Sequence, residues 1–267
     1  KRIGLRCLST SRNSICCLKF SLFVCSFVTF LDLLESCSKL FSEALDNNCA
    51  SLQEEVLALV SCIATLIEDK FVKYYPNFMP GLKQIIINTP NETTLQKDLR
   101  SNTIQTIGFM MDAIKNTKEN IDEFKQDGKE IVEIFSKILT SGKVTYDDPQ
   151  VTAITNALCQ VAAVLQEDFA PYLPPIMQKL IEGAKMNVDF KLEDAELPTN
   201  NEKEENLTSI TFKMKGLEGE KMLSLNTTAL ETKINSTQVL RHMAENLKTT
   251  FFPYVEETYQ VISELFE

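Results

Sequence analysis

The sequence has no tryptophan, only eight glycines, and a single histidine in 267 residues. Any Ser-His-Asp, Cys-His or multi-histidine metal site would depend on His242 alone. That residue stands among apolar positions such as Val239 and Met243, which favours a structural or surface role. The dispersed glycines form neither a G-x-G-x-x-G pattern nor a Walker loop. We therefore predict that the protein is not an enzyme and uses no cofactor.

Cysteine spacing excludes the common metal sites. The eight cysteines include no C-x-x-C pair, and none has a histidine close by in the sequence. Cys62 and Cys159 fall on or beside apolar helical faces, where a free thiol behaves as a small hydrophobic group. We expect free thiols and a reducing compartment.

Basic residues are fewer than acidic ones, and the net charge is −10. Residues 1–31 carry five basic residues and no acid, so the rest of the chain carries −15. A nucleic-acid partner would need a basic stripe, so none is expected. An acidic surface favours basic polypeptide partners, although solubility alone also explains it.

The first 31 residues form a basic and apolar segment of uncertain role. Phe20 to Leu31 is uncharged, which resembles the layout of a signal peptide, but the run is too short to span a bilayer. We expect a terminal helix here rather than a targeting segment, and no membrane insertion.

One stretch of sequence, from Glu68 to Leu82, returns further along the chain. Self-similarity at about 40–50 residues is typical of stacked helical repeats. We therefore predict an all-α HEAT-repeat solenoid of about five antiparallel helix pairs. The first copy has Phe71, Tyr74, Pro76, Met79 and Leu82; the second has Phe169, Tyr172, Pro174, Met177 and Leu180; the third has Phe251, Tyr254, Tyr259 and Ile262; and a degenerate fourth at Phe124 has Ile131, Val132 and Phe135.

Capping signals place several helix starts. Ser51 with Glu54 predicts a capping box, as does the segment from Thr93 to Gln96. Asp148 is a favourable N-cap before Pro149. Apolar spacing then predicts helices at about 32–45, 52–66, 71–87, 93–114, 120–140, 148–165, 171–186, 230–247 and 253–266. We assign HEAT repeats to residues 32–186 and a further helix pair to residues 230–267.

Residues 187–229 interrupt the helical pattern. The part up to Asn206 is acidic and too polar to pack, so we expect a mobile loop there. Alternating apolar residues from Ile210 to Met214, a turn at Gly216 to Gly219, and a return through Leu225 predict a β-hairpin.

Two sets of acidic residues are candidates to bind a partner. A solenoid presents one helix of each pair along a concave wall, and acids there would form charge-assisted hydrogen bonds with a lysine- or arginine-rich peptide. The recurring aromatic residues are expected to be core, because stacking on nucleic acid needs a positive groove. The first candidate set is Asp122, Glu123, Glu130, Glu133, Glu182, Glu256 and Glu257; the second, in the insertion, is Glu193, Asp194, Glu196, Glu202, Glu204 and Glu205.

The repeated stretch carries a family resemblance. Residues 68–83 are similar to a helix turn of the importin-beta-3 (importin 5) class of karyopherin-beta nuclear import receptors. The same register continues through residues 99–104, 147–150, 172–174 and 228–231, so the resemblance covers about residues 35–267. Residues 1–31 depart from the family, and the acidic insertion corresponds to a family insertion of different sequence.

The resemblance implies a function. Receptors of this class bind the basic nuclear-localisation signals of cargo, release cargo when Ran GTPase binds in its GTP form, and contact phenylalanine-glycine repeats of nucleoporins. They shuttle between cytoplasm and nucleus. The resemblance places this chain in the middle to later part of such a receptor, without the repeats that supply the main Ran contacts. A HEAT scaffold that assembles protein complexes without a transport role is the alternative.

Overall fold

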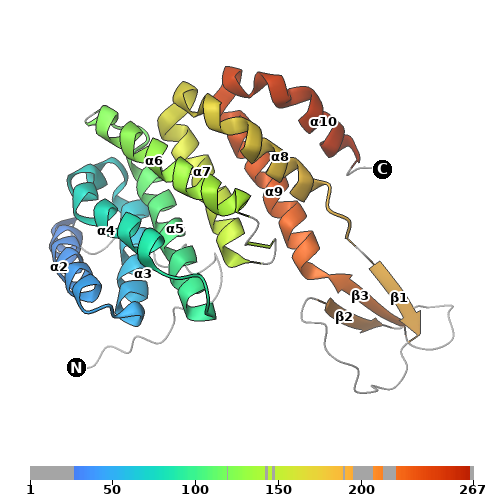
Figure 1. The fold of residues 1–267 in the computed structure, drawn as a ribbon, viewed down its shortest axis with the longest axis horizontal. Coiled ribbons are helices and arrows are strands. Elements are labelled where there is room, and N and C mark those ends of the chain that lie inside the picture. The colour runs from blue at the N-terminus through green and yellow to red at the C-terminus, as the bar shows by residue number, and fades with distance from the viewer. Residues whose placement is uncertain are drawn as a thin grey trace. The chain divides into compact units, whose positions relative to one another are not determined.

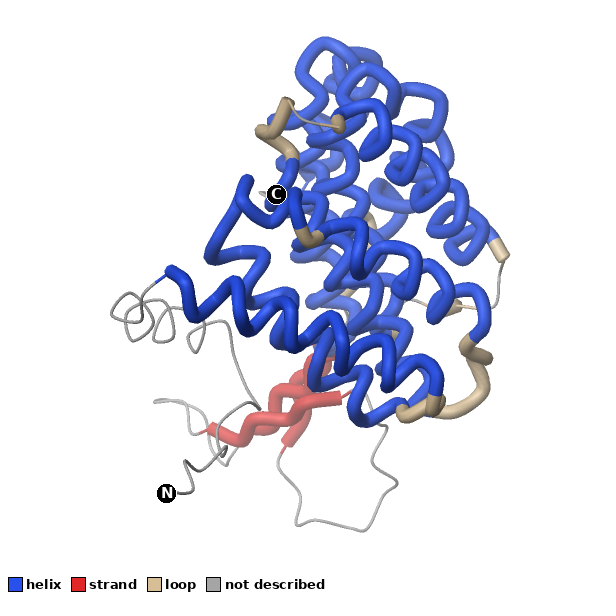
Figure 2. The backbone as a smooth tube through the Cα atoms, turned by 90° about the vertical axis from the view of Figure 1, so that its left-hand side faces the viewer, coloured by secondary structure: helices blue, strands red, loops and turns tan. Residues whose placement is uncertain are grey.

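The computed structural model describes residues 27–118, 120–141, 144–145, 148–188, 190–194, 207–212 and 221–264. The expectations for residues 1–26 lie outside this part of the chain. The described chain divides into two compact units, residues 1–122 and 123–267. Helices dominate both (Figures 1 and 2), which confirms the all-α repeat fold.

The helices follow one another in the order expected from their apolar spacing. The α-helices are α2 (Phe27–Asp46), α3 (Ala50–Ile67), α4 (Tyr75–Asn88), α5 (Thr94–Ile114), α6 (Ile121–Thr140), α7 (Pro149–Leu165), α8 (Leu173–Ala184), α9 (Thr227–Leu247) and α10 (Val255–Glu264). Three 3-10 helices intervene, namely η1 (Glu68–Lys73), η2 (Gln166–Tyr172) and η3 (Lys248–Tyr254).

The first unit packs its helices in two layers. Helix α3 lies against α5, while α2 lies against α4. The ring centroids of Phe41 and Phe78 are 5.8 Å apart, and those of Phe71 and Phe78 are 6.2 Å apart. Within the layer of α3 and α5, the Ser61 hydroxyl of α3 donates to Oγ1 of Thr106 on α5 at 2.9 Å. This core gathers the apolar faces that the sequence predicted.

The repeated sequence stretch forms the same turn three times. Helices α3, α7 and α9 each end at a residue with left-handed backbone, φ being 50° at Glu68, 51° at Gln166 and 49° at Lys248. In each case the backbone N–H of that residue donates to an alanine carbonyl four residues earlier. A 3-10 helix follows, and its phenylalanine is buried each time; the three are Phe71, Phe169 and Phe251. The interpretation of the recurring aromatic residues as core is confirmed for these three rings and for Tyr74, whereas Tyr172 and Tyr254 are half-buried.

The second unit contains the close approach of α8 to α9. Helix α7 also lies against α9, where the Cys159 thiol donates to the Val239 carbonyl at 3.6 Å. The Asn246 side chain donates to the Cys159 carbonyl at 2.9 Å. Burial raises the pKa of the Cys159 thiol to about 12. This cysteine therefore acts as a packing residue, as expected from its helical face.

Two of the three predicted caps are confirmed. Thr93 and Gln96 form the reciprocal capping box of α5, and Asp148 accepts from the N–H of Gln150 at the start of α7. The capping box predicted at Ser51 is wrong, because α3 begins earlier, at Ala50. The left-handed backbone of Asn48, with φ of 48°, reverses the chain so tightly that Ser51 already lies inside the helix.

A three-stranded antiparallel sheet stands where the helical pattern fails. Its strands are β1 (Phe190–Asp194), β2 (Leu207–Phe212) and β3 (Lys221–Asn226), in the order β1-β3-β2. The loop prediction is wrong for residues 190–194, whose backbone groups pair with β3. Residues 195–206 and 213–220 lie outside the described chain. Strand β3 leads directly into α9, which begins before the predicted boundary at residue 230 (Figure 1).

One described segment is apolar and long enough to cross a membrane. It runs from Ala50 to Lys73, through α3 and η1, with a mean hydropathy of 1.5. Its residues Val60, Ile63 and Ala64 are at most 1% exposed. The apolar character of α3 is therefore used for packing within the first unit.

Candidate functional site

The acidic residues of the first candidate set are all exposed. Each lies on a second helix of a repeat, where a partner can reach it. Asp122, Glu123, Glu130 and Glu133 lie on α6, Glu182 on α8, and Glu256 and Glu257 on α10.

Helix α6 separates its charges by face. Its lysines Lys125 and Lys129 both contact one carboxylate oxygen of Asp168 on η2, at 3.3 and 3.4 Å. The hydrogen bond from Lys125 is the main reason that the pKa of Asp168 is lowered. Glu130 and Glu133 of the same helix are exposed, and Glu130 accepts a hydrogen bond from the Gln126 side chain at 3.1 Å.

The structure brings Glu182 and Glu257 to one groove. The groove has a volume of about 310 Å³ and is formed by α8, η3 and α10. Met177 and Ile181 supply aliphatic lining, and Tyr254 supplies an aromatic ring. The sequence contained both acids as separate candidates, but their convergence follows only from the packing of α8 against α10.

The groove at Glu182 is not purely acidic. Gln178 donates to Oε1 of Glu182 at 3.1 Å, and Nζ of Lys179 lies 3.8 Å from Oε2. Lys185 also lines the groove. Lys179 and Lys185 thus balance the two carboxylates of Glu182 and Glu257. The apolar lining suits the methylene stem of a long cationic side chain. The arrangement can thus hold a lysine or arginine side chain with its charged end at the carboxylates.

The second candidate set is only partly described. Glu193 and Asp194 lie in β1, where the register places them opposite Met222 and Lys221 of β3. They are therefore strand residues rather than loop residues. The other members of the set lie outside the described residues, namely Glu196, Glu202, Glu204 and Glu205.

The single histidine is a surface residue. Nδ1 of His242 lies 3.2 Å from Oε2 of Glu245, and its other ring nitrogen lies 3.1 Å from Arg241. Its side chain is 47% exposed. Among the described residues, no group of three or more His, Cys, Asp or Glu side chains could hold a metal ion. The surface role expected of His242 is what the structure shows.

Comparison with known proteins identifies the family. Residues 32–197 match the family model described as importin subunit beta-1-like, TPR repeats. The chain belongs to the importin-beta family. This match covers more than half of the chain and includes the turn at Glu68 and its second copy at Gln166.

Individual importin relatives agree with this assignment. The chain is 23% identical over 219 residues to importin subunit beta-3 of Saccharomyces cerevisiae, covering 82% of this chain and 19% of the relative. It is 27% identical over 224 residues to a probable importin-5 homolog of Dictyostelium discoideum, covering 84% and 18%. The chain therefore spans about one fifth of the length of these relatives. They are transport receptors and not enzymes.

Solved importin structures share the fold. Kap121p bound to Pho4p superposes with a TM-score of 0.64 at 20% identity, covering 92% of this chain and 21% of that protein. Kap121p bound to RanGTP gives a TM-score of 0.62 at 23% identity, covering 90% and 20%. These likenesses establish a HEAT-repeat arrangement of the helices.

Proposed function

We propose that this chain is part of a nuclear import receptor and that its acidic second helices bind basic nuclear-localisation signals. The observation that carries the proposal is the groove where Glu182 and Glu257 meet beside Met177, Ile181 and Tyr254. A lysine stem packs on the aliphatic residues while its ammonium group reaches the carboxylates. The exposed acids of α6 extend the negative surface and steer a cationic peptide.

The likeness to known receptors supports the wider role. Kap121p has been solved with Pho4p and with RanGTP, and the curated relatives are importins. We propose that the full-length receptor releases cargo under the control of Ran, contacts phenylalanine-glycine nucleoporins, and shuttles between cytoplasm and nucleus. The proposal includes neither direct nucleic-acid binding nor membrane insertion.

A binding titration tests the acidic groove. We expect a fluorescein-labelled lysine-rich localisation peptide to bind the chain, with affinity that falls as salt is raised. The double variant Glu182→Lys with Glu257→Lys should weaken binding by at least about 10-fold, because it replaces two attractions with two repulsions. A second pair, Glu130→Lys with Glu133→Lys, should reduce affinity by a smaller factor through long-range charge alone.

Glu231→Lys provides the matched control. Glu231 is an exposed acid on α9. Its replacement by lysine changes the net charge by the same amount as each groove substitution does, but leaves the groove unaltered. If it weakens binding as much per substitution as the groove variants do, binding depends only on net charge and the proposed site is wrong. If the full-length protein retains neither Ran nor nucleoporin in a pull-down, the scaffold alternative is favoured.

A further inference from the structure

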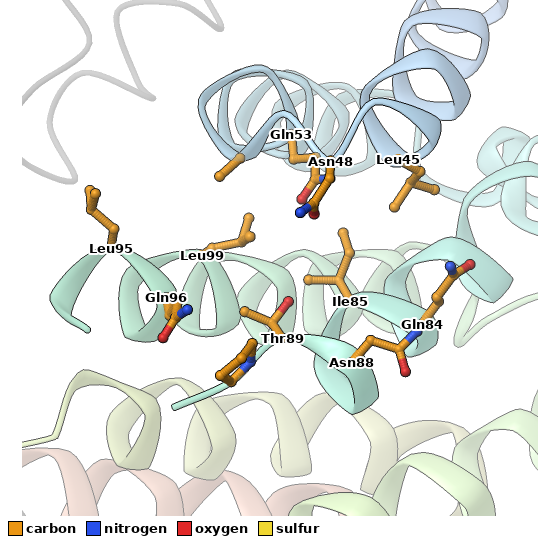
Figure 3. A pocket seen from close by; sticks show the side chains of 12 residues that line it. Leu45, Asn48, Gln53, Gln84, Ile85, Asn88, Thr89, Leu95, Gln96 and Leu99 are labelled. Carbon is orange, nitrogen blue, oxygen red and sulfur yellow. The ribbon is translucent and has the colours of Figure 1, made fainter. Parts of the chain in front are cut away.

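The first unit contains a groove of a different chemistry. It has a volume of about 360 Å³ and lies between the α2–α3 turn, the end of α4 and the start of α5. None of its lining residues carries a charge, and five of them are asparagine or glutamine. Figure 3 shows Asn48 of the α2–α3 turn and Gln53 of α3 reaching toward Ile85 and Leu99. The groove is thus an apolar floor bordered by carboxamides.

The walls of this groove are held in place by hydrogen bonds. Arg100, which is 8% exposed, donates to the carbonyls of Ile86 and Thr89 and so fixes the end of α4. The buried Gln53 donates to the carbonyl of Ala44 at 2.9 Å, which fixes the α2–α3 turn. The groove is therefore formed before a ligand arrives, which lowers the entropic cost of binding.

Two carboxamides at the groove remain available. Asn48 and Gln84 are exposed, and within the described part of the chain their side chains make no hydrogen bond. Each carboxamide offers a carbonyl acceptor and an NH₂ donor, which is the complement of a peptide group. Ile85 and Leu99 are each 4% exposed, while Leu95 at the rim is 72% exposed.

We propose that this groove binds an uncharged peptide segment in extended conformation. The main-chain amide groups of the segment would pair with Asn48 and Gln84, and one of its aliphatic side chains would lie between Leu95 and Leu99. An ionic ligand has no counter-charge here, because the lining is neutral. The volume is at the lower end of the usual range for ligand sites and suits a few extended residues at about 3.3 Å each.

This site is independent of the acidic groove. It lies in the first unit, whereas Glu182 and Glu257 lie in the second. Binding here should also be insensitive to salt, because no charges are paired. Loss of either activity by mutation therefore leaves the other to be measured separately.

Side-chain amide resonances provide a direct test. The capped peptide acetyl-Ser-Leu-Ser-Leu-Ser-amide is titrated into the ¹⁵N-labelled chain while the NH₂ signals of Asn48 and Gln84 are followed. We expect both to shift and saturate, with a Kd between about 0.1 and 1 mM at low and at high salt. The double variant Asn48→Gly with Gln84→Ala should weaken binding about 10-fold, because two hydrogen bonds are lost.

The variants are chosen to preserve the fold. Glycine adopts the left-handed backbone of Asn48, and alanine suits the exposed helical position of Gln84. Asn77→Ala removes an exposed carboxamide from the same helix outside the groove and should leave the Kd unchanged. If the double variant does not fold, Gln84→Ala alone should still weaken binding about 3-fold.

Three results would overturn the proposal. One is the absence of shifts at Asn48 and Gln84 at the highest peptide concentration. Another is equal affinity of the wild-type chain and the groove variants. The third is tighter, salt-sensitive binding of a lysine-flanked version of the peptide at these two residues, which would show that recognition here is ionic.

Discussion

Substitution of Gly183 by alanine tests the contact between α8 and α9. A β-carbon at this position would stand 2.3 Å from Oγ of Ser236, 3.3 Å from its Cβ, and 3.5 Å from Cγ2 of Thr232. Rotation of the serine can move Oγ away, but Cβ cannot move unless α9 shifts. Overpacking in a core costs about 1–3 kcal/mol, and alanine recovers about 1 kcal/mol of helix propensity. We expect a net loss of about 1 kcal/mol.

Urea unfolding, followed by far-UV circular dichroism, measures this loss as a lower transition midpoint. Ser236→Ala removes the oxygen that makes the closest contact. In the Gly183→Ala background it should therefore restore part of the lost stability, and a double-mutant cycle gives the coupling. If Gly183→Ala is as stable as the wild type or more so, helix propensity outweighs the contact and α8 does not press on α9 as the structure indicates.

Three other groups give simpler tests. The pKa of Asp168 is lowered chiefly by its hydrogen bond from Lys125, so its ion pairs stabilise the fold at neutral pH. This stabilisation should be lost as the pH falls below about 4, where the carboxylate is protonated. The melting temperatures of the wild type and of Asp168→Asn should therefore converge in acid. Iodoacetamide labelling read by peptide mapping should modify exposed Cys49 and spare Cys159, whose buried thiol has a pKa of about 12; labelling of both at equal rates would contradict that burial. The pKa of Glu54 is raised mainly by burial and secondly by a nearby carboxylate on α5, so its ionised form destabilises the fold at pH 7. Glu54→Gln should therefore raise the melting temperature at pH 7, and the difference from the wild type should disappear as the pH falls. A lower melting temperature of this variant at pH 7 would refute the argument.

Local signals in the sequence predicted helix starts well where the cap itself decides the boundary. Asp148 and Thr93 accept backbone N–H groups of the first helical turn as expected. At Ser51 the same reasoning failed. The turn at Asn48 is set by its left-handed backbone and by the buried hydrogen bond of Gln53 to Ala44, which link two helices. A capping pattern of four consecutive residues does not reveal a contact between two helices.

The three left-handed turns show a different limit. The sequence revealed the repeat through its aromatic residues, yet Glu68, Gln166 and Lys248 are respectively acidic, neutral and basic. None is a glycine, which is the usual signal for such a backbone. The common feature is the alanine four residues earlier, whose carbonyl accepts the turn's N–H. That alanine is too frequent a helix residue to predict the turn by itself.

The acidic character of the candidate site was predictable from the sequence, but its position was not. Net charge indicated an acidic surface, and exposure of every described member of the first set agrees with it. Which acids share a groove depends on the turn of α8 that faces α10, and this rotation is set by Ile181 and Met177 packing inward. The carboxamide groove was missed altogether, because its residues come from a turn and from the ends of four helices that are separated in the sequence.

The buried phenylalanines that mark the family are not the residues proposed to bind a partner, although Met177 and Tyr254 of the same repeated stretch line the acidic groove. Stacked repeats must bury the same positions each time, so Phe71, Phe169 and Phe251 recur and are at most 3% exposed. Buried rings cannot touch a peptide. The recognition that we propose uses exposed side chains such as Glu182 and Asn48, which no packing requirement forces to repeat. The two grooves they line can therefore differ in chemistry: two carboxylates stand at one, and only uncharged side chains line the other.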